Sequence, residues 1–165
     1  MASLQRIQPC LWFDGRGEEA ANFYVAIFPD SRIVKIVRYG REGFEIHGQP
    51  AGSVLTVDFE LDGQRFTALN GGPLFKFNEA VSLQVLCDTQ QEVDHYWERL
   101  TAGGDPAAQQ CGWLKDRFGL SWQVVPRIAL ELLGNPESAN SQRAFGAMMN
   151  MKKLDIAALQ KAYAG

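Results

Sequence analysis

Apolar and polar residues follow each other along this chain in an order that occurs twice. An apolar run from Ile7 to Phe13 stops at Asp14-Gly15, and a second run from Val81 to Cys87 stops at Asp88. Each run predicts a β-strand, and each is followed by a helical pattern whose first residues are acidic. The repeated order indicates two copies of one supersecondary unit.

The two predicted helices have the same sequence pattern. The first extends from Gly17 to Phe28 and the second from Gln90 to Ala102. Each carries an aromatic pair about two turns from its start, Phe23-Tyr24 in one and Tyr96-Trp97 in the other. Proline ends the first pattern and a glycine pair ends the second, as is typical of helix ends.

Each helix is followed by predicted strands. In the first half, Ile33 to Tyr39 is rich in β-branched residues, and Leu55 to Leu61 alternates apolar with polar positions. Asp62-Gly63 then predicts a tight hairpin that returns through Gln64 to Asn70. In the second half, two shorter runs, Cys111 to Lys115 and Leu120 to Val125, are expected to pair across a turn that contains Gly119. The patterns predict an α+β fold of paired βαβββ modules, the second shortened, whose sheets enclose a cavity.

The chain changes character after Pro126. Three helices are predicted, over Ile128–Leu133, Ser138–Met151 and Leu154–Tyr163. We therefore expect a domain over residues 4–127 and a helical extension over residues 128–165. The methionines of this extension indicate packing on the domain or on a dimer partner.

Composition limits the partners. A net charge of −3 with mixed signs and no basic stripe argues against nucleic acid. The odd number of cysteines, Cys10, Cys87 and Cys111, without metal-type spacing fits reduced thiols in the cytoplasm. No segment has the length and apolarity of a signal peptide or a membrane span. We expect a soluble, cytoplasmic protein.

Two segments resemble a known family. One is LWFDG (11–15) with EAANFY (19–24) and FPDS (28–31), and the other is CGWLKDRFGLSWQVVP (111–126). They resemble the PhnB-like group of the vicinal oxygen chelate superfamily, which is related to glyoxalase I and to bleomycin-resistance proteins. The resemblance implies an open, U-shaped mixed sheet with a cavity and a homodimeric assembly.

Members of this group are also labelled 3-demethylubiquinone-9 3-methyltransferase-like. We find no glycine-rich strand-to-helix turn followed by an acidic residue that suggests a nucleotide-like methyl donor site, so we do not expect methyl transfer.

Enzymes of the superfamily hold a divalent metal with four inward-facing side chains, usually His, Glu or Gln. The resemblance places Gln8, Asn70, Ser82 and Gln123 at these positions. All four are neutral and none offers an imidazole or a carboxylate, so the sequence predicts no metal and no other cofactor. His47, in a loop, and His95, on a helix, are expected to be solvated and to leave this prediction unchanged.

Residues two apart on a strand share a face, which extends the predicted lining of the cavity. The expected ligand-binding positions are Gln8, Cys10, Trp12, Phe66, Asn70, Ser82, Gln84, Trp113 and Gln123. Such a lining suits a small, largely uncharged molecule. Alternatively, Gln8, Ser82 and Gln123 bond to each other inside a filled sheet. Trp113, Phe75 and Phe77 either wall the cavity mouth or belong to the core.

Cys10 could be a nucleophile, but no basic group accompanies it on its strand, which favours an inert thiol. Three functions remain open: a metal-independent binding protein, a metal-dependent lyase or dioxygenase-type enzyme of the same superfamily, and an interaction protein with a vestigial cavity.

Overall fold

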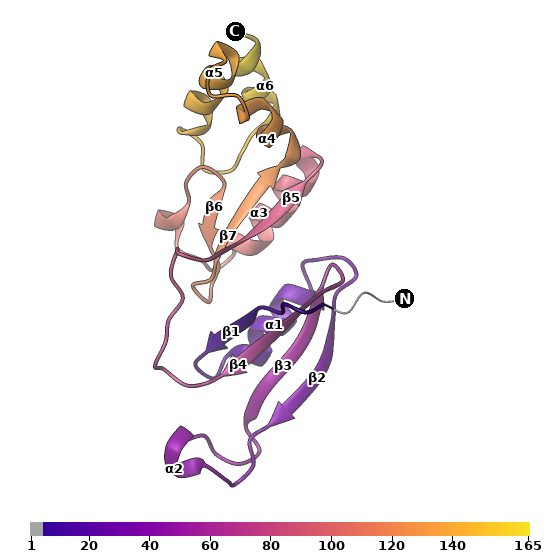
Figure 1. Cartoon of the computed structure of the whole chain (residues 1–165), viewed down its shortest axis with the longest axis vertical. Helices are drawn as coiled ribbons and strands as arrows, with labels where there is room; N and C mark the ends of the chain where they lie inside the picture. The colour runs from indigo at the N-terminus through magenta and orange to yellow at the C-terminus, as the bar shows by residue number, and fades with distance from the viewer. Residues whose placement is uncertain (1–4) are drawn as a thin grey trace. The chain divides into compact units, whose positions relative to one another are not determined.

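The computed structural model describes residues 5–165, which form two compact units (Figure 1). The first ends at Phe77, and the second extends over Asn78–Gly165. Each unit has its own sheet with a helix on one face.

The first unit contains a mixed sheet of four strands in the order β1-β4-β3-β2. The strands are β1 (Cys10–Phe13), β2 (Arg32–Arg38), β3 (Val54–Leu61) and β4 (Gln64–Asn70). β1 pairs with β4 in parallel and the remaining pairs are antiparallel. Helix α1 (Gly17–Val25) follows β1, and the loop between β2 and β3 forms a short helix, α2 (Phe44–His47).

The predicted hairpin between β3 and β4 is confirmed. Asp62 and Gly63 have φ angles of +48° and +76°, as a two-residue type I′ turn requires. This turn fixes the register so that Leu61 pairs with Gln64 and Phe59 with Phe66.

The core of the first unit lies between α1 and one face of its sheet. Val57 and Phe59 of β3 are fully buried, as are Ala21 and Tyr24 of α1. Tyr24 stacks on Phe59 with ring centroids 6.3 Å apart. The alternation of buried and partly exposed residues along β3 is the period of two that predicted the strand.

The second unit repeats this arrangement with one strand fewer. Its sheet has the order β5-β7-β6, with β5 (Ser82–Cys87) parallel to β7 (Ser121–Pro126) and β6 (Trp113–Lys115) antiparallel to β7. Helix α3 (Gln90–Thr101) follows β5 as α1 follows β1. The segment that follows α3 forms a 3-10 helix (Pro106–Ala108) where the first unit has β2.

β6 begins two residues later than the predicted Cys111. Cys111 and Gly112 both have positive φ, +51° and +84°, and form a two-residue turn between Gln110 and Trp113, which bond to each other through their backbones. The Cys111-Gly112 pair is therefore a hairpin loop rather than the start of a strand.

The C-terminal helices α4 (Arg127–Leu133), α5 (Ala139–Met148) and α6 (Ile156–Ala164) belong to the second unit. The segment before α6 is bonded to this unit: Cys111 N donates to Met151 O at 2.8 Å, and Gly112 N donates to Lys152 O at 2.7 Å. Leu154 is 2% exposed and lies against Gly112.

The predicted α+β class and the repeated order of elements are confirmed. Asp14 follows β1 as Asp88 follows β5, and Gly63 and Gly119 lie in corresponding turns with positive φ. Both sheets are mixed and open. The enclosure of a cavity by the two sheets and the domain bounds stay predictions.

Candidate functional site

Each sheet has a helix-covered face and an open face, and the strand register assigns every side chain to one of them. In the first sheet, Cys10 pairs with Thr67 and Thr67 with Asp58, so these three share the open face. Trp12 pairs with Leu69 and joins them. The predicted common face of Cys10 and Trp12 is observed.

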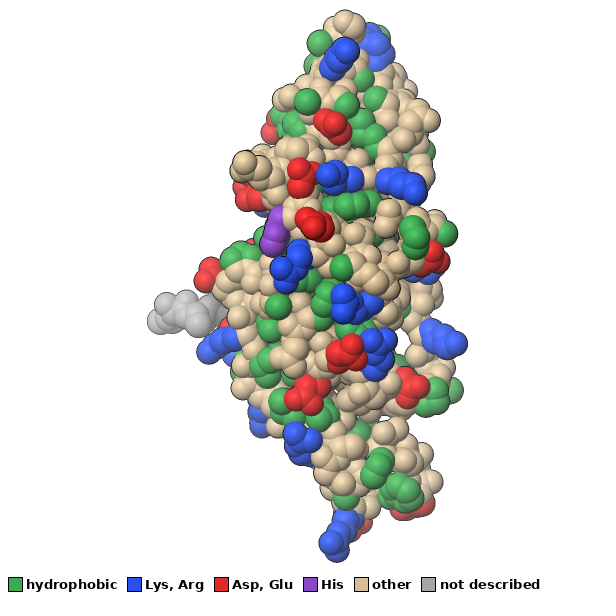
Figure 2. All heavy atoms as spheres, turned by 180° about the vertical axis from the view of Figure 1, so that it is seen from behind, with side chains coloured by type: hydrophobic (Ala, Val, Ile, Leu, Met, Phe, Trp, Pro, Cys, Tyr) green, Lys and Arg blue, Asp and Glu red, His purple; other side chains and the backbone are tan. Residues whose placement is uncertain are grey.

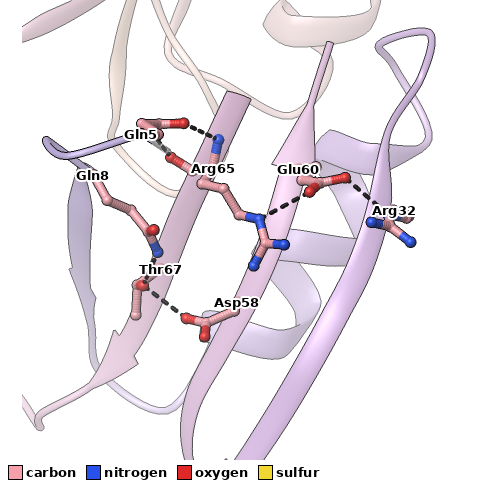
Figure 3. Close-up of polar contacts among 7 residues, drawn as sticks. All are labelled: Gln5, Gln8, Arg32, Asp58, Glu60, Arg65 and Thr67. Atoms are coloured by element: carbon pink, nitrogen blue, oxygen red, sulfur yellow. Dashed lines mark hydrogen bonds and ion pairs between the residues drawn. The ribbon is translucent and has the colours of Figure 1, made fainter. Parts of the chain in front are cut away.

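A chain of hydrogen bonds crosses the open face of the first sheet (Figure 3). Gln8 Nε2 donates to Thr67 Oγ1 at 2.8 Å, and the Thr67 hydroxyl donates to Asp58 Oδ1 at 2.8 Å. Gln8 therefore shares the open face with Cys10, and its amide bonds within its own unit.

Charged residues occupy the next row of the same face. Glu60 lies between two guanidinium groups, 2.8 Å from Arg32 and 2.8 Å from Arg65 (Figure 3). The hydrogen bond from Arg32 is the main reason why the pKa of Glu60 lies below its ordinary value. This row is a surface ion network in which one carboxylate pairs with two guanidinium groups.

Two of the expected cavity residues, Phe66 and Asn70, lie on the opposite, helix-covered face, so their predicted placement is wrong. Asn70 pairs with Phe13 and Phe66 with Phe59, and all four are buried. A shift of one residue moves a side chain to the other face of a sheet. The family resemblance therefore placed Asn70 one residue out of register relative to Trp12 of β1.

Asn70 instead connects three elements. Its Oδ1 accepts a hydrogen bond from Gly17 N at 2.8 Å, at the start of α1, and its Nδ2 donates to Val54 O at 3.1 Å, at the start of β3. The side chain is buried and its polar atoms are used. Asn70 is thus a structural residue.

Trp12 is held by the segment that follows β4. Its Nε1 donates to Gly72 O at 2.8 Å, and its ring meets Phe75 edge-on with centroids 4.9 Å apart. A side chain at Gly71 would come within 2.3 Å of the indole. Phe77 packs on the buried Phe13, which favours the core interpretation for Phe77.

The cysteine thiols are poorly suited to nucleophilic attack. Burial, followed by the charge of Asp58, raises the pKa of Cys10. Burial and the charges of Glu92 and Asp88 raise the pKa of Cys87 to about 12. Both thiols are therefore protonated near neutral pH, which favours the inert interpretation of Cys10.

The open face of the second sheet carries a different set of residues. The register places Ser82, Ser121 and Lys115 in one row across the three strands, and Gln84, Gln123 and Trp113 in the next. Four predicted site residues, Ser82, Gln84, Trp113 and Gln123, therefore share this face. The alternation of the strands was sufficient to place them together.

A directed hydrogen-bond chain links the amides of this face. Gln84 Nε2 donates to Gln123 Oε1 at 3.4 Å, and Gln123 Nε2 donates to Ser82 Oγ at 2.8 Å. Ser82 and Gln123 thus satisfy each other in part, as the filled-sheet alternative supposed, but Gln8 bonds to Thr67 instead.

Ser121 and Lys115 lie on this face and are functional candidates beyond the expected ligand-binding positions. Ser121 is 1% exposed, and its Oγ has no hydrogen-bond partner among the described residues. Its cross-strand neighbour Lys115 forms an ion pair with Glu79, whose pKa lies below its ordinary value mainly because Lys115 donates a hydrogen bond to it. A hydroxyl on a strand carries no sequence signal that distinguishes a paired from an unpaired group.

The positions that hold a metal in the superfamily do not fit one here. Gln8 and Asn70 point to opposite faces of one sheet, and the Gln123 amide is bonded to Ser82. No cluster of three or more His, Cys, Asp or Glu residues suited to a metal occurs within residues 5–165. Neutral amides leave the charge of a dication uncompensated, which is costly.

One strand-to-helix turn does match a nucleotide-binding pattern in its letters. Residues 15–20 follow the spacing Gly-x-Gly-x-x-Ala. In the structure this turn packs against Asn70. Gly17 N is bonded to Asn70, and a Cβ at Gly17 would lie 2.8 Å from Asn70 Oδ1. Glu18 and Glu19 add negative charge at the helix start, which disfavours a phosphate there.

The histidines lie apart from both open-face rows. His47 is in α2, where Gln49 N donates to its Nδ1 at 3.0 Å and Tyr39 packs against the ring. His95 is exposed on α3 and packs against Tyr96. Neither residue is part of the hydrogen-bond chain of either sheet.

The surface offers mixed charge. On the face drawn in Figure 2, acidic and basic side chains are interspersed. Within residues 5–165, no helix has both the length and the apolar character needed to cross a lipid bilayer.

Two α+β units with open mixed sheets, the second a shortened repeat of the first, define the class of protein. The family model described as 3-demethylubiquinone-9 3-methyltransferase matches residues 5–125, and the chain belongs to this family. A solved PhnB protein from Bacillus cereus is 36% identical, with a TM-score of 0.62, and the match covers 74% of this chain and 99% of that one. The recognition of a PhnB-like protein is confirmed.

A more distant structure shares the fold. A Pseudomonas aeruginosa protein is 19% identical with a TM-score of 0.57, over 74% of this chain and 97% of that one. No curated protein matches the chain.

Proposed function

We propose that this protein binds a small, largely uncharged organic molecule on the open face of its second sheet, without a resident metal. The observation that carries the proposal is the row formed by Gln84, Gln123 and Trp113, in which two bonded amides lie beside an aromatic ring. Small-molecule sites combine apolar walls with a few oriented polar groups. The open face of the first sheet is less suitable because ion pairs occupy much of it.

A metal-dependent lyase or dioxygenase is disfavoured because of the donor set. Ser82 and Gln123 offer a hydroxyl and an amide, and Asn70 is committed to the backbone of α1 and β3. Divalent metals in proteins are held mainly by charged carboxylate or imidazole ligands, which this set lacks.

Titration with benzamide, a neutral aromatic amide, tests the proposal. We expect saturable shifts in the side-chain amide NMR signals of Gln84 and Gln123 in the presence of a chelator. Gln123→Ala should weaken binding by about tenfold, as loss of an oriented hydrogen bond predicts. Gln91→Ala, an exposed change on α3, serves as control.

The same experiment has a metal arm. Calorimetry of the wild type with Zn²⁺ or Ni²⁺ alone should show no binding in the micromolar range or tighter. Benzamide binding that requires added metal, or that is unaffected by Gln123→Ala, would overturn the proposal.

We also propose that the protein is a homodimer in the cytoplasm. The family resemblance supports the dimer, and the free thiols of Cys10, Cys87 and Cys111 are typical of a reducing compartment. The methyltransferase label of the family is not proposed as the activity, because the glycine turn before α1 serves to pack the helix on Asn70.

A further inference from the structure

The row of Ser82, Ser121 and Lys115 has hydrogen-bonding capacity that the protein leaves unused. Ser121 Oγ is buried without a partner among the described residues, which costs folding free energy unless something outside the chain satisfies it. Unsatisfied buried hydroxyls are uncommon in folded proteins. The register places this buried hydroxyl on the sheet face opposite the helix, in one row with Ser82 and Lys115.

The hydroxyl of Ser82 also has a proton to donate. Its oxygen accepts the hydrogen bond from Gln123, which in turn accepts from Gln84. The Ser82 oxygen is therefore already used as an acceptor, and the Ser82 O–H remains available as a donor. Two neighbouring hydroxyl donors favour a ligand group that only accepts hydrogen bonds.

Lys115 supplies the charge. It is the cationic side chain among the strand positions of this face, as the register of residues 82–87, 113–115 and 121–126 shows. Its partner, Glu79, lies before β5 and its side chain is 64% exposed. The Lys115 ammonium group is thus already paired with a solvent-exposed carboxylate. Another carboxylate can replace it at little cost in free energy, because exposed ion pairs are weak.

We propose that this row binds the single carboxylate of an otherwise uncharged, apolar or aromatic ligand, which displaces Glu79 from Lys115 and accepts hydrogen bonds from Ser82 and Ser121. The inference rests on the proposed function and adds the chemical class of the ligand. One ammonium group balances one negative charge, which favours a monocarboxylate over a phosphate dianion. Trp113, Leu86 and Val125, on the same face, are suited to the apolar body.

Paired titrations with benzoate and benzamide test the inference, because the two probes have the same ring and differ in charge. We expect benzoate to bind the wild type more tightly than benzamide does. Lys115→Met should weaken benzoate by at least about tenfold, as loss of a charged hydrogen bond predicts, and leave benzamide unchanged. Lys161→Met, an exposed change on α6, is the control and should change neither.

Two further variants act in directions that misfolding cannot imitate. Glu79→Gln removes the competing carboxylate and should tighten benzoate binding by about two- to fivefold, the worth of an exposed ion pair. Ser121→Ala should weaken benzoate binding while the protein stays at least as stable as the wild type, since the substitution removes an unsatisfied hydroxyl.

The outcomes separate the inference from the proposed function. If benzamide binds as well as benzoate and Lys115→Met changes neither, the carboxylate inference is overturned and the proposed function stands. If neither probe binds the wild type, both are overturned. Loss of stability in Ser121→Ala would also count against the inference, because it would mean that the hydroxyl has a partner within the protein.

Discussion

At the scale of single residues, Asn70 determines how α1 sits on its sheet. The residue before α1, Arg16, provides no side-chain cap, and the amide of Asn70 bonds to the first helical N–H from a strand far along the chain. The same amide reaches the backbone of β3. A strand residue therefore accepts a hydrogen bond from the helix N-terminus, as the side chain of a neighbouring Ser, Thr or Asp does in most helices.

Replacement of Asn70 by Ala should lower the free energy of unfolding of the first unit by about 2–3 kcal/mol, because it leaves the buried Gly17 N without its acceptor and removes the hydrogen bond to Val54 O. Urea unfolding followed by circular dichroism measures the loss. Asn22→Ala is the matched control, since Asn22 lies exposed on α1 and Ala favours the helix. Equal stabilities for the two variants would contradict the structural role.

The candidate site shows which residue placements the sequence could supply. Alternation along β5 and β7 placed Ser82, Gln84 and Gln123 on one face, because the period of two holds in any strand. It could not place Asn70, since the face there depends on a register that the Asp62-Gly63 turn and the parallel partner β1 set together. The pairing state of Ser121 depends on neighbours that only the fold brings close.

At the scale of elements, one glutamine of α3 bonds to the start of the last helix, α6. Gln90 Nε2 donates to Leu154 O at 3.1 Å, and Gln90 Oε1 accepts from Ile156 N at 2.8 Å. Lys153 adds an ion pair with Asp94 one turn further along α3. The start of α6 is thus bonded to the helix of the repeated module. The sequence predicted the three helices but left open what they pack on.

Replacement of Gln90 by Ala should loosen α6 while the sheet of the second unit stays intact. We expect faster hydrogen exchange at Ile156 N, by about tenfold, since a backbone donor loses its partner. Gln91→Ala changes the neighbouring, exposed residue of the same helix and should leave exchange unchanged. The bond from Gln90 would not anchor α6 if both variants exchanged like the wild type.

At the scale of the whole molecule, the open sheets leave edges. In the first sheet β1 and β2 are terminal strands, and in the second β5 and β6 are. Strands with unpaired backbone groups are normally covered, charged or paired with another chain. β2 carries Arg32, Lys35 and Arg38, which protects it by charge, while the short β1 and β6 have no such row.

Sedimentation velocity should therefore show a stable homodimer, of twice the 18.4 kDa chain mass, at micromolar concentration. The physical reason is the cost of leaving sheet edges and apolar side chains such as Leu130 and Phe145 in water. A dilution series distinguishes a stable dimer from a weak one. A monomer throughout that range would refute the proposal.

The sequence by itself determined the class of fold, the repeated order of strand and helix, and the face that each central strand position shares. These follow from local rules: the periods of strands and helices, and the turn chemistry of Asp62-Gly63. Tertiary structure decided the rest. It turned Cys111 and Gly112 into a hairpin loop, committed Asn70 to the start of α1, and left Ser121 Oγ without a partner among the described residues. Such outcomes depend on which distant backbone and side-chain groups become neighbours, and hydrogen bonds between distant residues leave no period in the sequence.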